Sequence, residues 1–276
     1  MRNAHDAARR LPVLAATLAL FTLPAAAAAQ VDDEEWLENC RDQRDRRLEH
    51  YCAVQVQRVE AAGTPIRVDA HPNGPIQVLG WDHGQIEVHM RVAARAETEA
   101  EARELAERVR LVISGTTIAA DGPERRRDAD WHAGFVVLVP RRSDLQIETY
   151  NGPLVVEGVA GRMELSTRNG PLSLRDVGGD VHARTANGPL TVVLAGTSWD
   201  GAGLDAEAVN GPVTLLIPEG YSARLETGTI NGPMSSDVPL TVERIERRSR
   251  ISAVLGSGGP PVRVVTMNGP LSIKRR

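Results

Sequence analysis

Apolar and β-branched side chains recur at every second position around a repeated tripeptide in the second half of the chain. Six residues before each copy the side chain is Leu, Met or Val, and three residues after its asparagine it is again Leu, Val or Met. This alternation predicts strands with one buried face. The six copies of Asn-Gly-Pro begin at Asn151, Asn169, Asn187, Asn210, Asn231 and Asn268.

The tripeptide changes the phase of the alternation by one residue, as a bend between two strands does. Proline also biases the preceding glycine toward extended backbone, which disfavours a tight hairpin. We therefore expect a mainly β protein, a β-solenoid-like (β-helix) array of coils stacked about 4.8 Å apart, with the asparagines in a hydrogen-bonded ladder. The alternative is an antiparallel β-meander or sandwich with the same period.

The sequence before the array alternates in several further strands and then changes period once. The segment ETEAEARELAERVRLV has apolar residues on one helical face and predicts one N-terminal helix. We interpret residues 59–140 as a β-rich cap with that helix, and residues 141–276 as the β-repeat array. A seventh Asn-Gly-Pro at Asn73 stands 78 residues before the next copy, so we expect it to lie outside the ladder.

The beginning of the chain predicts export. Three arginines precede an apolar run that closes on PAAAAAQ, which is typical of a signal peptide over residues 1–29. Cys40 and Cys52 are the two cysteines, and in an oxidising compartment they are expected to form a disulfide in a stapled segment over residues 30–58. We expect a periplasmic, cell-surface or extracellular protein with no transmembrane segment in the mature chain.

Candidate chemistry is sparse. The formal net charge of −4 gives no electrostatic reason to expect nucleic acid, and the spacing of motifs predicts no cofactor, no metal site and no catalytic residue. One outward column could bind or cleave a glycan, although an ordinary solvated face has the same composition. Its members, five residues before each asparagine, are Gln146, Glu164, His182, Asp205, Glu226 and Arg263.

A second outward column, directly before each asparagine, becomes apolar in its second half. Val209, Ile230 and Met267 are the candidate binding residues there. Either a loop within residues 238–258 folds over them, which we favour, or they form an exposed strip available to a partner.

The repeated Thr-x-Asn-Gly-Pro-Leu, the strand pair VLGWDHGQIEVHM before a helix, and the closing GSGGPPVRVVTMNGPLSI resemble the bacterial putative-adhesin family of β-strand repeat proteins. The resemblance covers about residues 59–273 and implies a surface or envelope protein without assigned catalytic residues. That family commonly has Thr-x-Asn-Gly-Asp-Ile, so proline here removes a repeated acidic column.

Together these patterns predict an exported, non-enzymatic protein whose repetitive β face binds an envelope polymer, a surface protein or further copies of itself. The alternative function is a glycan-processing β-solenoid enzyme, a polysaccharide lyase or hydrolase, which would need convergent carboxylates in a cleft.

Overall fold

The computed structural model describes residues 31–42, 47–61, 65–70, 73–246 and 250–276. Its fold is mainly β, a two-sheet parallel β-solenoid, and the meander alternative is excluded because successive repeats pair in parallel. The predicted signal peptide over residues 1–29 lies outside the described residues.

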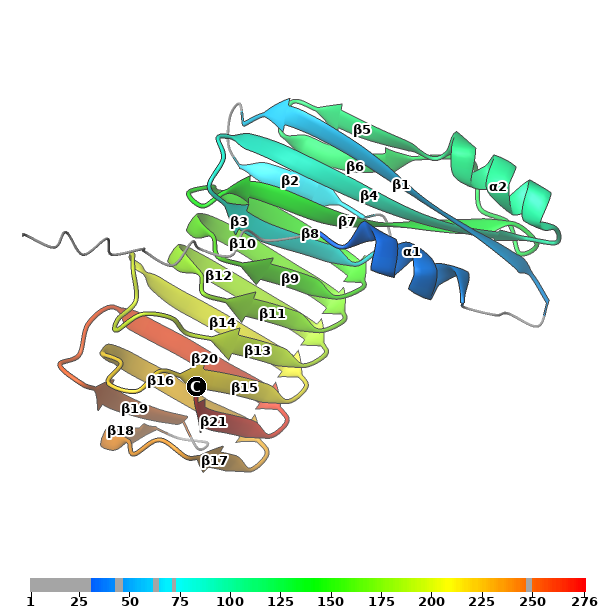
Figure 1. The fold of residues 1–276 in the computed structure, drawn as a ribbon. Helices are drawn as coiled ribbons and strands as arrows, with labels where there is room; N and C mark the ends of the chain where they lie inside the picture. The colour runs from blue at the N-terminus through cyan, green and yellow to red at the C-terminus, as the bar shows by residue number, and fades with distance from the viewer. Residues whose placement is uncertain (1–30, 43–46, 62–64, 71–72, 247–249) are drawn as a thin grey trace, which may run out of the picture.

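The solenoid has seven coils, each made of one strand in each sheet joined at an Asn-Gly-Pro corner (Figure 1). In stacking order the coils are β2 (Ile66–Asp69) with β3 (Ile76–Trp81), β8 (Leu145–Asn151) with β9 (Leu154–Glu157), β10 (Ala160–Asn169) with β11 (Leu172–Arg175), β12 (Gly178–Asn187) with β13 (Leu190–Val193), β14 (Gly203–Asn210) with β15 (Val213–Ile217), β20 (Pro261–Asn268) with β21 (Leu271–Arg275), and β16 (Ala223–Asn231) with β17 (Met234–Ser236).

Further strands extend both ends of the stack. At one end the sheet that contains β3 and β9 (sheet A) continues through β7 (Asp130–Pro140), which is parallel to β3, and then through the antiparallel strands β4 (Gln85–Ala96) and β1 (Glu49–Glu60). The sheet that contains β2 and β8 (sheet B) continues through β6 (Thr117–Asp121), which is parallel to β2, and then through the antiparallel strand β5 (Arg110–Ser114). At the other end the hairpin β18 (Thr241–Glu246) and β19 (Arg250–Leu255) continues sheet B beyond β16.

Two helices pack at the first end, where a single helix was predicted. The predicted helix is α2 (Glu99–Arg108), capped by Thr98, whose hydroxyl accepts a hydrogen bond from the Glu101 amide at 3.2 Å. Leu105 and Ala106 of this helix are buried in the main core. The helix not foreseen is α1 (Asp33–Arg41), capped by Asp32, and it lies against the outer face of sheet A (Figure 1).

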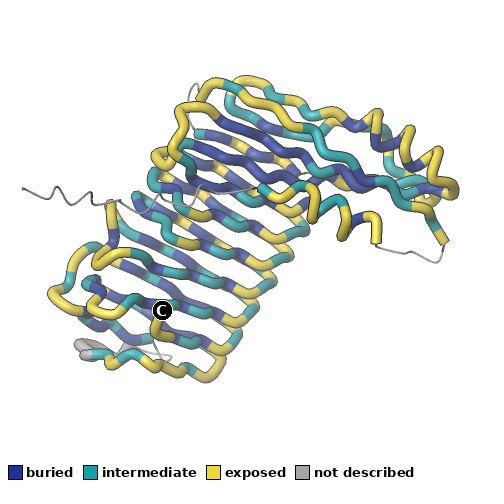
Figure 2. Tube along the Cα trace, viewed as in Figure 1, coloured by how far each residue is buried: buried dark blue, intermediate teal, exposed yellow. Residues whose placement is uncertain are grey.

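The core is a column of aliphatic side chains between the sheets, and the corner beside it explains the repeated motif. Corner residues are exposed along one border of the stack, while the strands between them alternate between buried and accessible positions (Figure 2). Leu172 is 1 % exposed and lies between Leu154 and Leu190 of the adjacent coils. Its amide also donates to the Pro189 carbonyl at 2.9 Å, so each coil is bonded to the next through its backbone.

Each polar group of Thr-x-Asn-Gly finds its partner in a neighbouring coil. Thr185 donates its hydroxyl to the Gly170 carbonyl at 3.0 Å, and the Gly170 amide donates to the Asn187 carbonyl at 3.0 Å. Glycine is required because the coils approach closely: a Cβ on Gly170 would lie 2.2 Å from the carbonyl oxygen of Gly152. The motif is therefore the product of stacking identical corners rather than of a binding role.

The asparagine side chains form a ladder along this corner. Each amide nitrogen donates to the carbonyl oxygen of the preceding asparagine at 2.7–3.0 Å. The expectation for Asn73 was wrong, because its side-chain oxygen accepts from Asn151 at 2.7 Å and so begins the ladder. The β2–β3 coil supplies Asn73 despite its distance in sequence. The order is Asn73, Asn151, Asn169, Asn187, Asn210, Asn268 and Asn231.

That order reveals an inserted coil. The last coil in sequence, β20–β21, does not stack at the end of the solenoid but lies between β14–β15 and β16–β17, with parallel pairing on both sides. The coils β14–β15 and β16–β17 follow each other in the sequence, but in the stack they are separated by a coil that comes later in the sequence.

Candidate functional site

The outer face of sheet B carries a broad groove across five successive coils. Its volume is about 840 Å³, and it extends from β2 through β8, β10 and β12 to β14. Side chains at alternate strand positions point outward into it, because the intervening positions face the core. We refer to the outward-facing residues of these strands, with those of β20 and β16, as the sheet-B wall. The outward groove residues are Arg67, Asp69, Gln146, Glu148, Tyr150, Glu164, Ser166, His182, Arg184, Asp205 and Glu207.

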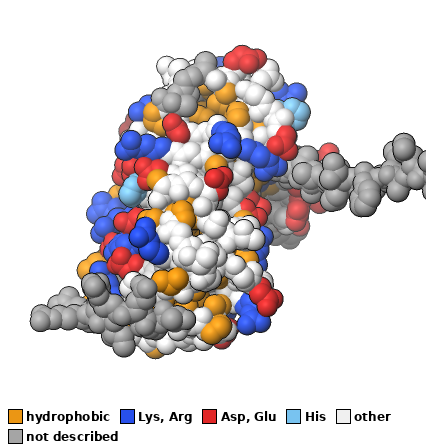
Figure 3. Space-filling model, turned by 90° about the vertical axis from the view of Figure 1, so that its left-hand side faces the viewer, with side chains coloured by type: hydrophobic (Ala, Val, Ile, Leu, Met, Phe, Trp, Pro, Cys, Tyr) orange, Lys and Arg blue, Asp and Glu red, His pale blue; other side chains and the backbone are white. Residues whose placement is uncertain are grey.

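Opposite charges alternate along this wall and pair across neighbouring strands. Arg184 and Glu207 lie 3.8 Å apart, and Arg67 donates its Nε to the amide oxygen of Gln146 at 2.9 Å. Basic and acidic side chains are also interspersed in the side view of the stack (Figure 3). The wall therefore presents hydrogen-bond donors and acceptors at every strand without a large field of one sign.

Tyr150 stands out on the wall because it is an exposed large hydrophobic residue, 47 % accessible to solvent. The Arg168 guanidinium of the next coil lies over this ring, 4.9 Å from its centroid. The ring attracts the cation, which favours this arrangement of the two side chains. An aromatic surface with a polar rim is thus held at the edge of the groove.

The column predicted as a glycan site lies on this wall, but the inserted coil changes its order. Arg263 comes between Asp205 and Glu226 rather than after them. Its Nη1 lies 2.5 Å from Asp205 Oδ1, and its Nε lies 3.3 Å from Glu226 Oε1. Burial alone would lower the pKa of Arg263, but its hydrogen bond to Asp205 and the nearby carboxylates raise it.

The remaining members of that column do not form a comparable cluster. Glu164 lies 3.9 Å from Arg162 of its own strand, and His182 lies 3.5 Å from Asp180 of its own strand. All four of these side chains are about half exposed or more. Across the residues that the structure describes, no group of three or more histidine, cysteine or acidic side chains is arranged to hold a metal ion.

The three predicted binding residues lie together at the lower end of the wall. The stacking order places Met267 between Val209 and Ile230, and all three are half-buried. The loop expected to cover them instead forms β18 and β19, which lengthen sheet B. Val238 and Leu240, in the connection to that hairpin, pack against the end of the main core.

A second charged cluster ties α1 to sheet A. The Nδ1 atom of His89 on β4 lies 2.5 Å from Oδ2 of Asp33 on α1. Its Nε2 atom lies 2.9 Å from Oε1 of Glu87. Asp33 also accepts from Arg91 at 2.9 Å, and Glu87 pairs with Arg58. Burial alone would raise the pKa of Glu87, but hydrogen bonds from His89 and Arg58 lower it. Sequence reasoning missed this cluster, since its members are far apart in the chain and have no ligand-like spacing.

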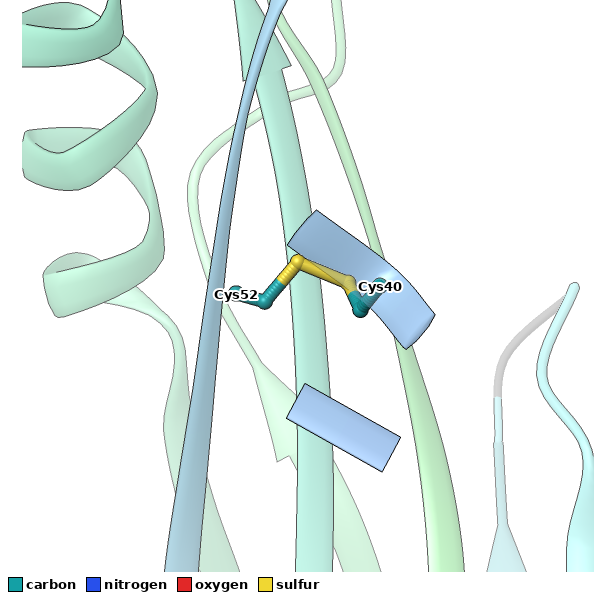
Figure 4. Close-up of a disulfide and its surroundings, with 2 residues drawn as sticks. All are labelled: Cys40 and Cys52. Carbon is teal, nitrogen blue, oxygen red and sulfur yellow. A yellow bond between two sulfur atoms is a disulfide. The ribbon is translucent and has the colours of Figure 1, made fainter. Parts of the chain in front are cut away.

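The predicted disulfide is confirmed beside this cluster. Cys40 at the end of α1 is bonded to Cys52 on β1 (Figure 4). Both cysteines are buried together with Ala93, and Trp36 and Leu37 pack against them. The two cysteines are twelve residues apart in sequence, and the packing of α1 against β1 brings their Cα atoms to 6.3 Å.

Comparison with known proteins identifies the family. The model of the family described as Toastrack DUF4097 matches residues 116–274, which is more than half of the chain. The chain belongs to the Toastrack DUF4097 family. The resemblance drawn from the repeated motif is thereby confirmed at the level of family and fold.

Solved structures add a distant similarity in fold. A putative cell adhesion protein from Clostridium sporogenes is 8 % identical with a TM-score of 0.46, and the match covers 82 % of this chain and 100 % of that one. A putative adhesin from Bacteroides fragilis is 9 % identical with a TM-score of 0.31, covering 81 % and 97 %. No curated protein is significantly similar in sequence.

Neither of the two helices found in the described parts of this Toastrack DUF4097 chain is long and apolar enough to cross a membrane.

Proposed function

We propose that this chain is an exported, non-enzymatic envelope protein that binds an extended envelope polymer along the sheet-B wall. The observation that carries the proposal is the groove of about 840 Å³, which crosses five coils of a regular stack. A partner lying along the stack meets a new row of side chains about every 4.8 Å. Weak contacts with each row then add up over the length of the partner.

The groove has the chemistry that a polysaccharide needs. Hydroxyl groups of sugars donate to carboxylates such as Glu148 and Glu164 and accept from guanidinium groups such as Arg184, all of which line the groove. Tyr150 adds an exposed ring at its edge. The half-buried Val209, Met267 and Ile230 continue the same face and offer apolar contact to the partner.

Binding without chemistry is supported by how the candidate carboxylates are paired. Glycoside hydrolysis needs one carboxylic acid that keeps its proton beside a second that is ionised. Asp205 and Glu226 each form an ion pair with Arg263, so neither carboxylate stands unpaired beside the other. The contacts of the wall therefore stabilise stacking and recognition more readily than proton transfer.

Export is part of the proposal. The disulfide between Cys40 and Cys52 is the kind of bond that persists in an oxidising compartment. Residues 1–29 have the pattern of a signal peptide. We infer a periplasmic or cell-surface location for the mature chain.

The test is a pull-down of the mature chain with purified envelope polysaccharides, using wall variants and a matched control. Val209→Ser with Ile230→Ser removes half-buried apolar surface from the sheet-B wall. Val193→Ser with Leu216→Ser removes similar half-buried surface from the outer face of sheet A.

Capture should fall only in the sheet-B double variant. An equal fall in both variants, or in neither, would contradict a binding site on this wall. Polysaccharide cleavage that disappears in Glu164→Gln would support the glycan-processing alternative instead.

A further inference from the structure

The C-terminal coil occupies a position that the chain order does not require. β14 and β16 are consecutive coil strands, and each pairs in parallel with β20 in the same register. Val264 of β20 has Ala206 of β14 on one side and Thr227 of β16 on the other. Because the registers match, β16 could stack directly on β14, and insertion of β20–β21 opens a slot between them.

The slot is lined by groups that any copy of the chain supplies. Asn268 donates to Asn210 and accepts from Asn231, at 2.8 and 2.7 Å. Arg263 joins the carboxylates on both sides of the slot. These contacts depend on the inserted coil and its two neighbours, and they would be identical if the coil came from another molecule.

The connection that delivers the coil has the features of a hinge. Residues 256–260 read Gly-Ser-Gly-Gly-Pro, and Gly256 and Gly258 have φ of 52° and 80°. A hydrogen bond from the Gly258 amide to the Leu255 carbonyl at 2.9 Å holds them in a tight turn. Pro260 and Pro261 follow and favour extended backbone in the residues before them. The hinge can therefore turn back, as it does here, or extend over about 17 Å.

We propose that β20–β21 is an exchangeable coil. The β20–β21 coil of one copy of this chain inserts between the β14–β15 and β16–β17 coils of a second copy. Exchange keeps every contact within the slot and changes only the hinge, so it requires little new interface. If two copies exchange coils with each other, the product is a dimer. If each copy inserts its coil into a different neighbour, the product is an open chain of copies. This proposal does not depend on the ligand of the sheet-B wall.

Single-cysteine chains distinguish exchange from insertion within one chain. Ala206 and Val264 are opposite each other across the slot and are fully buried. Neighbouring strands are about 4.8 Å apart, which is within the range that a disulfide bridges. Chains carrying Ala206→Cys and chains carrying Val264→Cys are co-expressed with different tags, exported and separated on a non-reducing gel.

A disulfide-linked heterodimer of the two tagged chains is expected, and it should disappear on reduction. The matched control pairs Ala206→Cys with Ala183→Cys, which are also opposite each other but both belong to the part that does not exchange. That pair should give no linked heterodimer. A chain with both Ala206→Cys and Val264→Cys reports insertion in its own slot.

A second measurement removes residues 257–260 from the hinge. The single residue left between Leu255 and Pro261 spans at most about 7 Å, whereas these two residues lie on opposite sides of β16, two strand spacings or about 9.6 Å apart. The shortened hinge cannot turn back, so light scattering should find the variant as a dimer at concentrations where the unaltered chain is largely monomeric. The proposal is overturned if the cysteine pair forms no heterodimer and the shortened chain is monomeric or fails to fold.

Discussion

Replacing Gly170 by alanine tests the close approach of neighbouring coils at the Asn-Gly-Pro corner. The added Cβ would lie 2.2 Å from the carbonyl oxygen of Gly152 and 2.7 Å from its carbonyl carbon. A favourable carbon–oxygen contact is about 3.3 Å, so the two coils must separate by about 1 Å at this corner. Both atoms belong to the backbone of the corner between β8 and β9, which is hydrogen-bonded to the next coil, so they cannot move aside alone.

Three hydrogen bonds cross the joint that would open. Thr167 donates its hydroxyl to Gly152 at 3.3 Å, the Gly152 amide donates to Asn169 at 3.2 Å, and Asn169 donates its side-chain amide to Asn151 at 2.9 Å. At about 1 kcal/mol each, their weakening costs up to about 3 kcal/mol. The lower entropy of an unfolded chain with alanine offsets about 0.4–1 kcal/mol of this. We expect Gly170→Ala to lower the free energy of unfolding by about 2 kcal/mol.

Urea denaturation followed by far-UV circular dichroism measures that change. Gly84→Ala is the matched control, because a Cβ there meets no atom within 4 Å. Neither Gly170 nor Gly84 has a positive φ, so backbone strain does not enter the comparison. Equal midpoints for the two variants would refute the view that close stacking demands glycine at this corner.

Three further predictions concern stability. Asn169→Ala should cost about 1 kcal/mol more than Asn73→Ala in thermal denaturation, since Asn169 makes two ladder bonds and Asn73 makes one; equal shifts would contradict it. Burial raises the pKa of Tyr221 from 10.0 to about 12, so the stability it contributes is complete below pH 10 and is lost as pH rises to about 12; a Tyr221→Phe chain should lose less stability over that interval. Replacing Cys40 and Cys52 by alanine should remove about 3 kcal/mol from the free energy of unfolding, measured by urea titration, and an unchanged midpoint would oppose this.

The local structure of the repeats could be predicted because each copy of the repeat contains the residue pattern that determines it. The alternation around Asn151 or Asn187 gives the strands, and the change of phase gives the corner between them. The period of α2 was equally clear, because Leu105 and Ala106 fall on one helical face. These features depend on residues close in sequence, where periodicity is informative.

The order of the coils could not be predicted in the same way. Asn268 and Asn231 have similar surroundings in sequence, and either coil could have followed Asn210 by its pattern alone. The Asn73 coil was excluded from the ladder only because of the 78 residues before the next copy. After β3, those residues form β4, α2, β5, β6 and β7 at the end of the stack, and the chain then returns to pair with the coil it left. Distance along the chain was therefore a poor guide to distance in space.

The charged contacts escaped prediction for a related reason. Asp33 and His89 are 56 residues apart, and only the docking of α1 on sheet A brings them together. The first-turn acids of α1 follow Asp32, which is a favourable N-cap, so a short helix could have been inferred there. Its position on the sheet could not, because a helix of nine residues has few apolar contacts to specify where it packs.

The corner and the wall of the solenoid have different constraints, and this difference bears on where binding occurs. At the corner each residue faces its own copy, so stacking alone accounts for threonine, asparagine and glycine. On the sheet-B wall alternate side chains face away from the core, and stacking does not require any one residue there. Some residues of the wall nevertheless hold strands together, since Arg263 on β20 forms ion pairs with Asp205 on β14 and Glu226 on β16. The upper coils, where Tyr150 is exposed beside the groove, are less constrained by such pairs. We therefore propose that a partner is recognised most selectively at the upper coils, whereas the lower coils supply apolar contact and hold the inserted strand.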